Sequence, residues 1–449
     1  MDVKESIFKS YDIRGVYPQE VNEEIAYRVG RALVSHVNAR AVIVGRDMRL
    51  SSPQLHDALV RGITEQGADV FDIGLATTDM FYYACGSTDF PGVTVTASHN
   101  PKEYNGFKMV RKLPDLIGGG NGMEEIRDMV IANKFSTPAA KGTVQDKDIR
   151  DEYRKKILSL VTTEHITPQK IIVDAANGLG GVVFDLVYRD FPIDVVRMYF
   201  EPDGRFPNHG GDPLQAKNRK ELEARVITEG ASLGFAFDPD ADRFFVIDEK
   251  GEFVPGDFMT ALLGEYLVKK YGGGNVVYDL RASWAVRDLI TKAGGSVFEN
   301  RVGHAHIKPR MQEEDAIFGG EVTGHYYFRD FFFSDSGVLP SLVVISMLCE
   351  YGKTMSELLA PLVAHYHISG EINSTVADAD EVLRKIKCYY EKDFAVHELD
   401  GVSIISDEWH ANVRKSNTEP LVRLNVESVG DMALMEEKRD ELLKLIQSS

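Results

Sequence analysis

The segment that decides the fold reads AVIVGRDMRLSSPQLHDALVRGITEQ, residues 41–66. Residues 41–44 form a short apolar run in which three of the four side chains are β-branched, which favours a strand. A polar loop follows this run, and a helical pattern then extends over about residues 53–66. This order of strand, loop and helix predicts a βαβ unit built around a mostly parallel sheet.

The same order recurs twice further along the chain. Short β-branched runs occupy residues 171–173 (IIV) and 276–278 (VVY), and helical patterns follow over residues 181–188 and 285–292. The three similar starts predict three related α/β domains. Further strands are expected at residues 93–96, 233–237, 244–247 and 316–318.

The C-terminal stretch has a different pattern. A helical pattern over residues 378–391 precedes strand-like segments at residues 401–406 and 421–427. An amphipathic helical pattern over residues 431–447 follows them. Because the strands are not separated by helices here, this ordering predicts a small α+β domain.

A chain of 449 residues is too long to fold around one hydrophobic core, and the patterns divide it into four parts. We expect domains over residues 1–145, 146–252, 253–367 and 368–449. The predicted fold class is therefore three related α/β domains with mixed, mostly parallel sheets, plus a smaller C-terminal α+β domain.

The composition argues against nucleic acid and membrane as partners. The chain has 51 basic and 69 acidic side chains, and its net charge of −18 repels nucleic acid and anionic membranes. The longest apolar runs, such as residues 338–348, are shorter than the roughly 20 residues of a membrane span. Residues 1–12 lack the apolar region of a signal peptide, and the three widely spaced cysteines form no disulfide or metal-ligand pattern. We expect a cytoplasmic protein, and the oligomeric state stays open.

The first candidate site lies in VTVTASHNPKEYNGFK, residues 93–108. An alternating apolar run ends in small and polar residues followed by Pro101, which predicts a turn with outward-facing side chains and N–H groups. Ser98 stands beside His99 and is a candidate nucleophile, although it lacks the Gly-x-Ser-x-Gly frame of the hydrolases. Taken alone, the pattern is more typical of an ordinary turn at a strand end.

The second candidate site lies in LGFAFDPDADRFFVID, residues 233–248. Asp238, Asp240 and Asp242 alternate directly after an apolar strand, and in an extended chain this spacing sends all three carboxylates to one side. Three such charges favour a divalent cation among them, and all-oxygen ligation suits Mg²⁺. A calcium loop of the EF-hand type is disfavoured, because Arg243 stands where that loop requires glycine. A solvated acidic turn is the remaining alternative.

The third candidate site lies in VRKSNTEPLVRLNVE, residues 413–427. Ser416, Asn417 and Thr418 offer hydroxyl, amide and backbone donors, and Arg414 and Arg423 bracket them. Many donors together with guanidinium groups suit a phosphate ligand. A surface turn with two exposed arginines explains the same segment equally well.

Together these motifs resemble the α-D-phosphohexomutase family, and in particular its phosphomannomutase/phosphoglucomutase branch. The most specific matches are TASHNP at residues 96–101, DPDADR at 238–243 and SNTEP at 416–420, in that order, and the likeness begins with FKSYDIRG at residues 8–15 and includes GRD at 45–47. The resemblance implies four domains around a central cleft. It also implies an isomerase that interconverts hexose 1-phosphate and hexose 6-phosphate, of mannose and/or glucose, through a phosphoserine and a hexose 1,6-bisphosphate intermediate.

The resemblance further implies a role for each matching residue. Ser98 is expected to carry the phosphoryl group, and the expected Mg²⁺ ligands are a phosphoserine oxygen of Ser98, Asp238, Asp240 and Asp242. The catalytic residues expected around the transferring phosphoryl group are Arg14, Lys108, Arg243 and His304, with Lys108 and His304 as candidates for proton transfer. The residues expected to bind the substrate are Glu321 and Thr323 for the sugar, Arg414, Ser416, Asn417, Thr418 and Arg423 for its other phosphate, and in addition Arg281 and His325. The expected cofactors are Mg²⁺ and hexose 1,6-bisphosphate, and the expected partner is a small phosphosugar.

Two departures from the family pattern bear on the substrate. Arg281 stands where relatives often carry lysine, and Val322 and Thr323 stand where methionine and serine are frequent. Four alternatives stay open: a phosphopentomutase, a phosphoglucosamine mutase, a catalytically silent phosphosugar-binding protein, and a Mg²⁺-dependent phosphatase. A phosphoglucosamine mutase is disfavoured, because glycine is expected in place of Pro239 in that enzyme.

Overall fold

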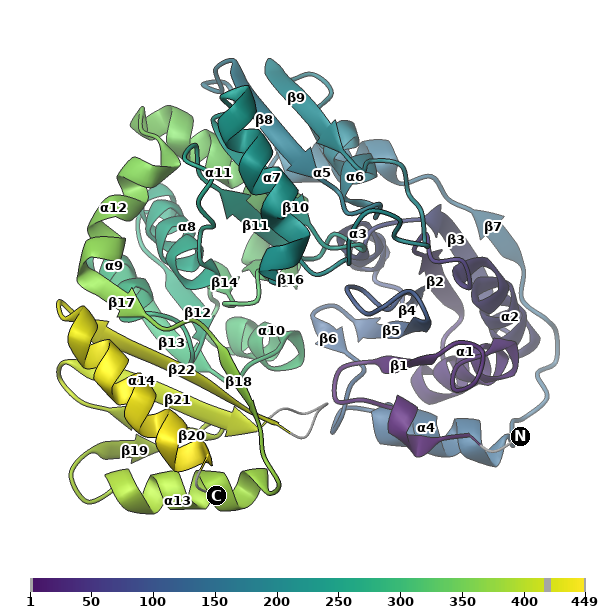
Figure 1. The fold of residues 1–449 in the computed structure, drawn as a ribbon. Helices are drawn as coiled ribbons and strands as arrows, with labels where there is room; N and C mark the ends of the chain where they lie inside the picture. The colour runs from purple at the N-terminus through teal and green to yellow at the C-terminus, as the bar shows by residue number, and fades with distance from the viewer. Residues whose placement is uncertain (1–2, 416–420, 448–449) are drawn as a thin grey trace.

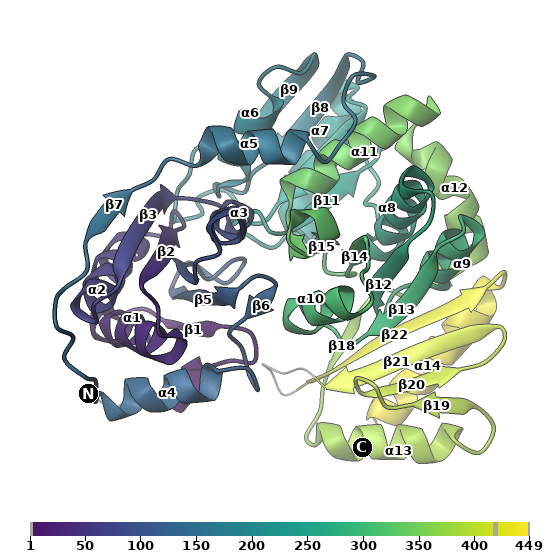
Figure 2. The same ribbon diagram turned by 180° about the vertical axis from the view of Figure 1, so that it is seen from behind.

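A computed structural model describes residues 3–415 and 421–447 of the chain. Four parts, each with its own sheet, follow one another around an arch, and the first and the fourth part face each other across its open side (Figures 1 and 2). The arrangement leaves room for one site that all four parts can reach.

The first part contains a sheet in the order β1-β5-β4-β2-β3-β7, with β6 paired to β5. Strands β4, β2, β3 and β7 run parallel, whereas β5 runs antiparallel to β1 and β4. The strands are β1 (Ile13–Val16), β2 (Ala41–Arg46), β3 (Asp69–Leu75), β4 (Gly92–Val95), β5 (Tyr104–Lys112), β6 (Asp115–Leu116) and β7 (Val144–Asp146). The helices are α1 (Glu23–Val37), α2 (Ser52–Glu65), α3 (Thr78–Thr88) and α4 (Met123–Ala132).

The second and third parts each contain a smaller mixed sheet, in the orders β11-β10-β8-β9 and β13-β12-β14-β15-β16. The strands are β8 (Gln169–Asp174), β9 (Ile193–Met198), β10 (Leu233–Phe237), β11 (Phe244–Ile247), β12 (Asn275–Asp279), β13 (Ser296–Asn300), β14 (Phe318–Gly320), β15 (Tyr326–Phe328) and β16 (Ser334–Asp335). The helices are α5 (Arg150–Leu158), α6 (Gly180–Tyr188), α7 (Ala216–Glu229), α8 (Gly256–Tyr271), α9 (Trp284–Lys292), α10 (His304–Glu313), α11 (Val338–Tyr351) and α12 (Met355–His365).

The fourth part is an antiparallel sheet in the order β17-β22-β21-β20-β19, with β18 paired to β22. The strands are β17 (Tyr366–Ile368), β18 (Ile372–Thr375), β19 (Ala395–His397), β20 (Val402–Ile405), β21 (Trp409–Lys415) and β22 (Leu421–Val429), and the helices are α13 (Ala379–Tyr390) and α14 (Met432–Gln447). The predicted fold class, three mixed α/β parts followed by an α+β part, is confirmed.

The two middle parts are packed as one unit. A single hydrophobic core contains Val173 and Phe235 of the second sheet together with Val276 and Phe318 of the third. This core also includes helix α3 of the first part and Tyr366 of β17, whereas the other side of the first part and most of the fourth part have cores of their own. Shared apolar packing therefore joins the two middle parts to each other and to one side of the first part.

Helix α11 is apolar on all sides, and eleven of its residues are buried. In the described part of the chain no helix is by itself long and apolar enough to cross a membrane. Helices α11 and α12 pass that test only when taken together, across a bend of 94°. Burial on every side explains why no amphipathic period marks α11 in the sequence.

The carboxyl ends of parallel strands carry the predicted site residues. Ser98 follows β4, Asp238 follows β10, Arg281 follows β12 and Glu321 follows β14. Open α/β sheets bind ligands at this edge of the strands, because the loops there are free to carry polar side chains. The topology thus brings residues from three sheets to the inside of the arch.

Candidate active site

A cavity of about 1340 Å³ is lined by residues of all four parts. The predicted site residues that line it are Arg14, Ser98, Lys108, Asp242, Arg243, Arg281, His304, Glu321, Thr323, His325, Arg414 and Arg423. Asp238 and Asp240 are buried directly beneath this lining. Ser416, Asn417 and Thr418 lie outside the described residues.

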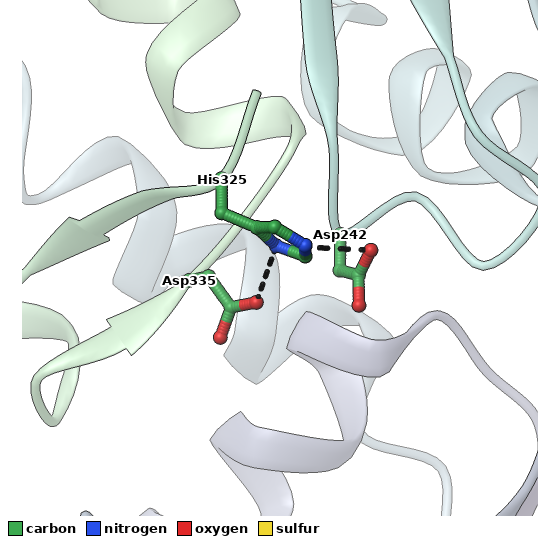
Figure 3. A group of neighbouring side chains, drawn as sticks. All are labelled: Asp242, His325 and Asp335. Atoms are coloured by element: carbon green, nitrogen blue, oxygen red, sulfur yellow. Dashed lines mark hydrogen bonds and ion pairs between the residues drawn. The ribbon is translucent and has the colours of Figure 1, made fainter. Parts of the chain in front are cut away.

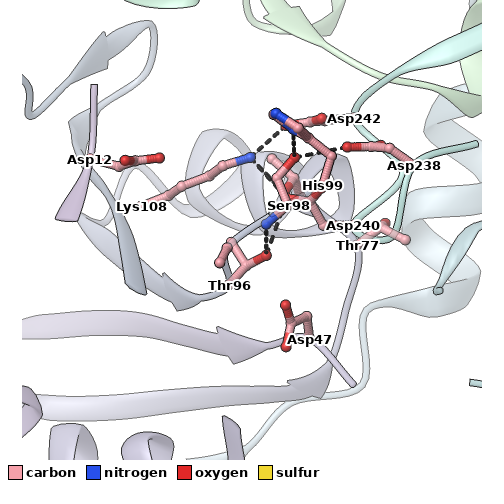
Figure 4. A network of polar contacts seen from close by, with 12 residues as sticks. Asp12, Asp47, Thr77, Thr96, Ser98, His99, Lys108, Asp238, Asp240 and Asp242 are labelled. Carbon is pink, nitrogen blue, oxygen red and sulfur yellow. Dashed lines mark hydrogen bonds and ion pairs between the residues drawn. The ribbon is translucent and has the colours of Figure 1, made fainter. Parts of the chain in front are cut away.

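The loop after β4 presents Ser98 in a left-handed backbone conformation, with φ of +47°. The Ser98 N–H donates to Thr96 Oγ1 across 3.0 Å, which closes the turn on itself. The Ser98 hydroxyl donates to Asp238 Oδ2 at 2.8 Å and lies 3.2 Å from His99 Nδ1 (Figure 4). A non-glycine residue with positive φ costs free energy, so neighbouring groups must hold it there.

Arg49 holds this loop from below, and its part was not predicted from the sequence. Its buried guanidinium donates to four backbone carbonyls within residues 98–104, at 2.6 to 2.9 Å. Asp47 Oδ2 lies 3.3 Å from Arg49 Nε and balances its charge. The sequence feature that could have pointed to Arg49 is the GRD match at residues 45–47, which ends two positions before it.

The three aspartates converge, but the chain between them is not extended. Asp238–Asp242 forms a turn, in which the Ala241 N–H donates to the Asp238 carbonyl at 3.0 Å and Ala241 has φ of +55°. One carboxylate oxygen of each of Asp238, Asp240 and Asp242 lies within 4.8 Å of the others. The prediction of a common cluster is confirmed, whereas its explanation by strand alternation is wrong: a turn gathers the carboxylates.

This carboxylate cluster has the donor set that a divalent cation requires. Asp240 Oδ1 and Asp242 Oδ1 are buried and have no hydrogen-bond partner among the described residues. Lys108 Nζ lies 2.8 Å from Asp240 Oδ2 and 2.5 Å from Asp242 Oδ2 (Figure 4). Two buried oxygens with free lone pairs, beside a third carboxylate and a serine hydroxyl, suit a hard cation.

The surroundings of Asp238 and Asp240 shift the pKa values of these two carboxyl groups in opposite directions. Burial raises the pKa of Asp238 well above its ordinary value, and the charges of Asp242 and Asp240 raise it further. Burial would raise the pKa of Asp240 as well, but the Lys108 ammonium lowers it below its ordinary value. Lys108 therefore neutralises Asp240, and Asp238 is the carboxylate whose charge is least compensated.

Two arginines flank the Ser98 hydroxyl. Arg14 donates to Asp12 Oδ2 at 2.8 Å and to the Ala97 carbonyl at 3.2 Å. The backbone N–H of Arg243 donates to Asp238 Oδ1 at 3.0 Å, and its Nε donates to His325 Nε2 at 3.1 Å. Both guanidinium groups are thus fixed by partners, and both line the cavity beside Ser98.

A buried chain of polar groups stands behind Arg243. His325 Nδ1 lies 3.0 Å from Asp335 Oδ2 and 4.0 Å from Asp242 Oδ1 (Figure 3). Because Nε2 accepts from Arg243, the imidazole proton resides on Nδ1. Lys308 Nζ, fully buried, lies 2.7 Å from Asp335 Oδ1 and compensates this carboxylate. Asp335 and Lys308 were not predicted from the sequence, because only the fold brings them beside His325.

Glu321 anchors the loop that carries His304. Its carboxylate accepts hydrogen bonds from the Gly303 N–H, at 2.8 Å, and from the Tyr327 hydroxyl. His304 begins α10, and its Nδ1 has no hydrogen-bond partner in the part of the chain that the structure describes. Burial, together with the charge of Lys308, holds the pKa of His304 well below its ordinary value, so the imidazole is neutral. Thr323 also lines the cavity.

The remaining predicted cations gather on one carboxylate, Glu371. Arg281 Nη1 lies 2.9 Å from Glu371 Oε2, Arg414 Nη2 lies 3.5 Å from the same oxygen, and Arg423 Nη1 lies 2.8 Å from Oε1. Asp279 binds Arg281 from the other side at 2.9 Å. The structure thus brings Arg281 into one cluster with the two arginines of the C-terminal motif. Glu371 itself, in the linker after β17, carried no sequence signal.

Models of one protein family match nearly the whole length of the chain. Four family models match it in order: "Phosphoglucomutase/phosphomannomutase, alpha/beta/alpha" domain I over residues 5–135, domain II over 151–251 and domain III over 255–366, and the "C-terminal domain" of the same family over 371–445. The four models together account for most of the sequence.

Curated relatives and solved structures agree with the family models. The phosphomannomutase of Escherichia coli K12 is 40% identical over 452 residues, covering 99% of both chains. The phosphohexose mutases of Xanthomonas campestris B100 are 38% identical, covering 98% of each chain. A crystal structure of a phosphoglucomutase/phosphomannomutase family protein from Burkholderia thailandensis superimposes with a TM-score of 0.90 at 27% identity, over 99% of this chain and 98% of that one.

A serine hydroxyl bound to an acidic cluster, a cleft reached by four parts and this end-to-end similarity all agree. The chain belongs to the phosphoglucomutase/phosphomannomutase family of phosphosugar mutases.

Proposed function

We propose that this protein is a Mg²⁺-dependent phosphohexomutase that interconverts hexose 1-phosphate and hexose 6-phosphate, of mannose and/or glucose, through a phosphoserine at Ser98 and a hexose 1,6-bisphosphate. The observation that carries the proposal is the bond from the Ser98 hydroxyl to Asp238, at 2.8 Å, within a cleft that also contains a cluster of three arginines. The relatives' names and the family models support it.

In the first transfer, the bond between Ser98 Oγ and phosphorus breaks while a free sugar hydroxyl forms a new bond to the same phosphorus. The hydroxyl proton passes to a base, for which the neutral His304 is the candidate. Lys108, the other residue expected in proton transfer, is an ammonium paired with Asp240 and Asp242 and could only donate a proton. His304 lines the cleft, and its buried Nδ1 has no hydrogen-bond partner among the described residues. Arg14 and Arg243 approach the phosphoryl group from fixed positions and compensate the charge on its oxygens.

In the second transfer, the bisphosphate has turned over and its other phosphoryl group moves to Ser98 Oγ. The proton then returns to the sugar oxygen that leaves. The phosphate that is not transferred stays with Arg281, Arg414 and Arg423, which contact Glu371 in the structure. A cluster that binds either phosphate of the sugar permits both orientations. For the sugar itself we propose Glu321, Thr323 and His325 as contacts.

Asp238, Asp240 and Asp242 would hold Mg²⁺ together with an oxygen of the phosphorylated Ser98. The family and the acidic cluster suggest a divalent metal, and the buried free oxygens of Asp240 and Asp242 fit one. When bound, such a cation stabilises negative charge on the transferring phosphoryl group. The chain itself contributes the orientation of Ser98, which Arg49 and Asp238 fix.

We further propose domain limits at residues 1–145, 146–252, 253–367 and 368–449, because each segment contains the greater part of one sheet; only β7 and β17 cross these limits, by one or two residues. A cytoplasmic location is supported by the three cysteines, Cys85, Cys349 and Cys388, which are all unpaired, as in a reducing compartment.

The test is a product analysis with Mg²⁺, a trace of hexose 1,6-bisphosphate and one sugar phosphate at a time. We expect the wild type to form hexose 6-phosphate from mannose 1-phosphate, glucose 1-phosphate or both, and the Ser98→Ala protein to form none. Product only from glucosamine 1-phosphate or ribose 1-phosphate would assign another mutase. Free phosphate without isomer would indicate a phosphatase, and sugar binding without product would indicate a silent binding protein.

A further inference from the structure

Glu371 occupies the centre of the arginine cluster. Its two carboxylate oxygens contact three guanidinium groups, those of Arg281, Arg414 and Arg423, at 2.8 to 3.5 Å. All four residues line the cavity. Burial would raise the pKa of Glu371, but the charges of Arg281, Arg423 and Arg414 hold it below its ordinary value, so the group is an anion.

With Glu371 in place, the three guanidinium groups keep one uncompensated charge, which is fewer than the two charges of a phosphate dianion. Asp279 binds Arg281 through two of its nitrogens, so one charge of the three is already compensated. Glu371 compensates a second charge and engages a terminal nitrogen of each guanidinium. A phosphate dianion that enters beside Glu371 would meet a like charge at contact distance, and the two anions would compete for the same donors.

The backbone at Glu371 suits a side chain that changes position. The residue lies between β17 and β18, in the linker that joins the third part to the fourth. Gly370, directly before it, has φ of +67°, and a Cβ built there would meet no atom within 4 Å. The preceding Ser369 is fastened to β22, since its N–H donates to the Val426 carbonyl at 2.8 Å. The linker is therefore fixed up to Ser369 and turns into open space at Gly370.

We propose that Glu371 is an internal occupant of the distal phosphate site: its carboxylate holds the three arginines together in the empty enzyme, and the phosphate that is not transferred displaces it. The inference rests on the proposed function. It deepens that function by making substrate binding an exchange of one anion for another. The bisphosphate must dissociate from the arginine cluster before it can turn over. Glu371 then binds the three guanidinium groups again, which lowers the free-energy cost of leaving them unpaired.

The exchange keeps the cluster from binding phosphate too tightly. Binding energy that acts equally on substrate, intermediate and product does not accelerate the chemical step, and it retards every step in which the phosphate must leave. A mutase depends on such a step, because its intermediate has to release one phosphate and rebind through the other.

The test measures the affinity for inorganic phosphate by calorimetry, without turnover, in the wild type and in Glu371→Gln. The amide has the size of the carboxylate and lacks its charge. We expect the variant to bind phosphate about 10-fold more tightly, and the KM for hexose 1-phosphate to fall while kcat does not rise. Glu371→Ala should change phosphate affinity in the same direction. Glu398→Gln, which removes an exposed carboxylate of the same part, is the control and should bind phosphate like the wild type.

Equal or weaker phosphate binding by Glu371→Gln would overturn the inference and would make Glu371 a residue that only positions the arginines. The binding measurement does not depend on the reaction. A wild type that binds phosphate but forms no 6-phosphate would therefore contradict the proposed function, and the role of Glu371 would still be decided by the variant.

Discussion

The Ser98 hydroxyl donates a hydrogen bond to Asp238 Oδ2 across 2.8 Å, although 140 positions of sequence separate the two residues. The bond joins the loop after β4 of the first part to the turn after β10 of the second. Nucleophile and acidic cluster are therefore positioned by separate sheets, and changes on either side of this contact should have distinct effects.

On the acidic side, Asp240→Asn and Asp238→Asn should differ in stability without metal. Asp240→Asn removes one of the two carboxylates that pair with the buried Lys108, and Asp242 remains at 2.5 Å, so the variant should lose less than the about 3 kcal/mol of unfolding free energy that breaking a whole buried ion pair costs. Asp238→Asn removes the least compensated carboxylate, so its stability should be unchanged or higher. Thermal unfolding in EDTA compares them, and both should lose Mg²⁺-dependent turnover. Equal destabilisation of the two variants would show that Lys108 does not distinguish these carboxylates.

On the serine side, Arg49→Lys should impair the chemistry more than the binding. Lysine keeps the charge but loses the planar fork that reaches four carbonyls of the Ser98 loop. A misplacement of about 1 Å can reduce rates about 100-fold, so we expect a kcat 10- to 100-fold lower with a KM changed much less. Arg61→Lys, an exposed change in the same part, should behave like the wild type. A raised KM with unchanged kcat would place Arg49 in substrate binding.

Arg414→Ala should raise KM and leave the phosphoryl transfer to and from Ser98 nearly unchanged, in contrast to Arg49→Lys. Arg414 lies in the cluster around Glu371, and a hydrogen bond to a charged group is worth about 1.5–3 kcal/mol. Binding of the hexose phosphate should weaken about 10- to 100-fold. Phosphorylation of Ser98 at saturating bisphosphate should change little, and more free bisphosphate should leave per turnover. Loss of Ser98 phosphorylation with unchanged KM would move Arg414 beside the nucleophile.

The sequence predicted the elements whose pattern is local. Strands β10 and β11 have the bounds expected for them, because an apolar run between polar turns defines a buried strand. The strand expected at residues 316–318 begins two residues later, as β14. Helix α11 gave no amphipathic signal because it is buried on all sides. A short apolar run between polar turns therefore marks a buried strand, whereas amphipathic periodicity marks a helix only where one of its faces meets solvent.

The candidate site was predictable where a motif carries its own chemistry. Ser98 and the three aspartates stand in short segments of polar residues after strands, which the sequence displays. Arg49 and Glu371 do not, because their importance lies in partners that only the fold brings near: four carbonyls in one case and three arginines in the other. Side chains that position other groups leave little trace in one sequence.

Asp257 makes stability depend on pH. It lies buried in the first turn of α8, and burial, with the nearby charge of Glu427, raises its pKa to about 7. The native state thus keeps a proton that the unfolded chain releases above about pH 4. Unfolding free energy should therefore fall as the pH rises from about 4 to 7, by up to about 4 kcal/mol for this group.

Asp257→Asn removes this titration. The melting temperature of Asp257→Asn minus that of the wild type should be several degrees higher at pH 8 than at pH 4.5. Calorimetry at both pH values measures this difference. Asp407→Asn, an exposed change, is the control and should show no such trend. A difference between Asp257→Asn and wild type that is the same at both pH values would mean that Asp257 is ionised throughout.

The most direct test of the account is the phosphorylation of Ser98. The protein is incubated with Mg²⁺ and hexose 1,6-bisphosphate, its intact mass is measured, and the modified peptide is sequenced. We predict a species one phosphoryl group heavier, with the group on Ser98, which added hexose 6-phosphate then removes as bisphosphate; Ser98→Ala should gain nothing. Phosphate on another residue, together with full mutase activity in Ser98→Ala, would contradict the account.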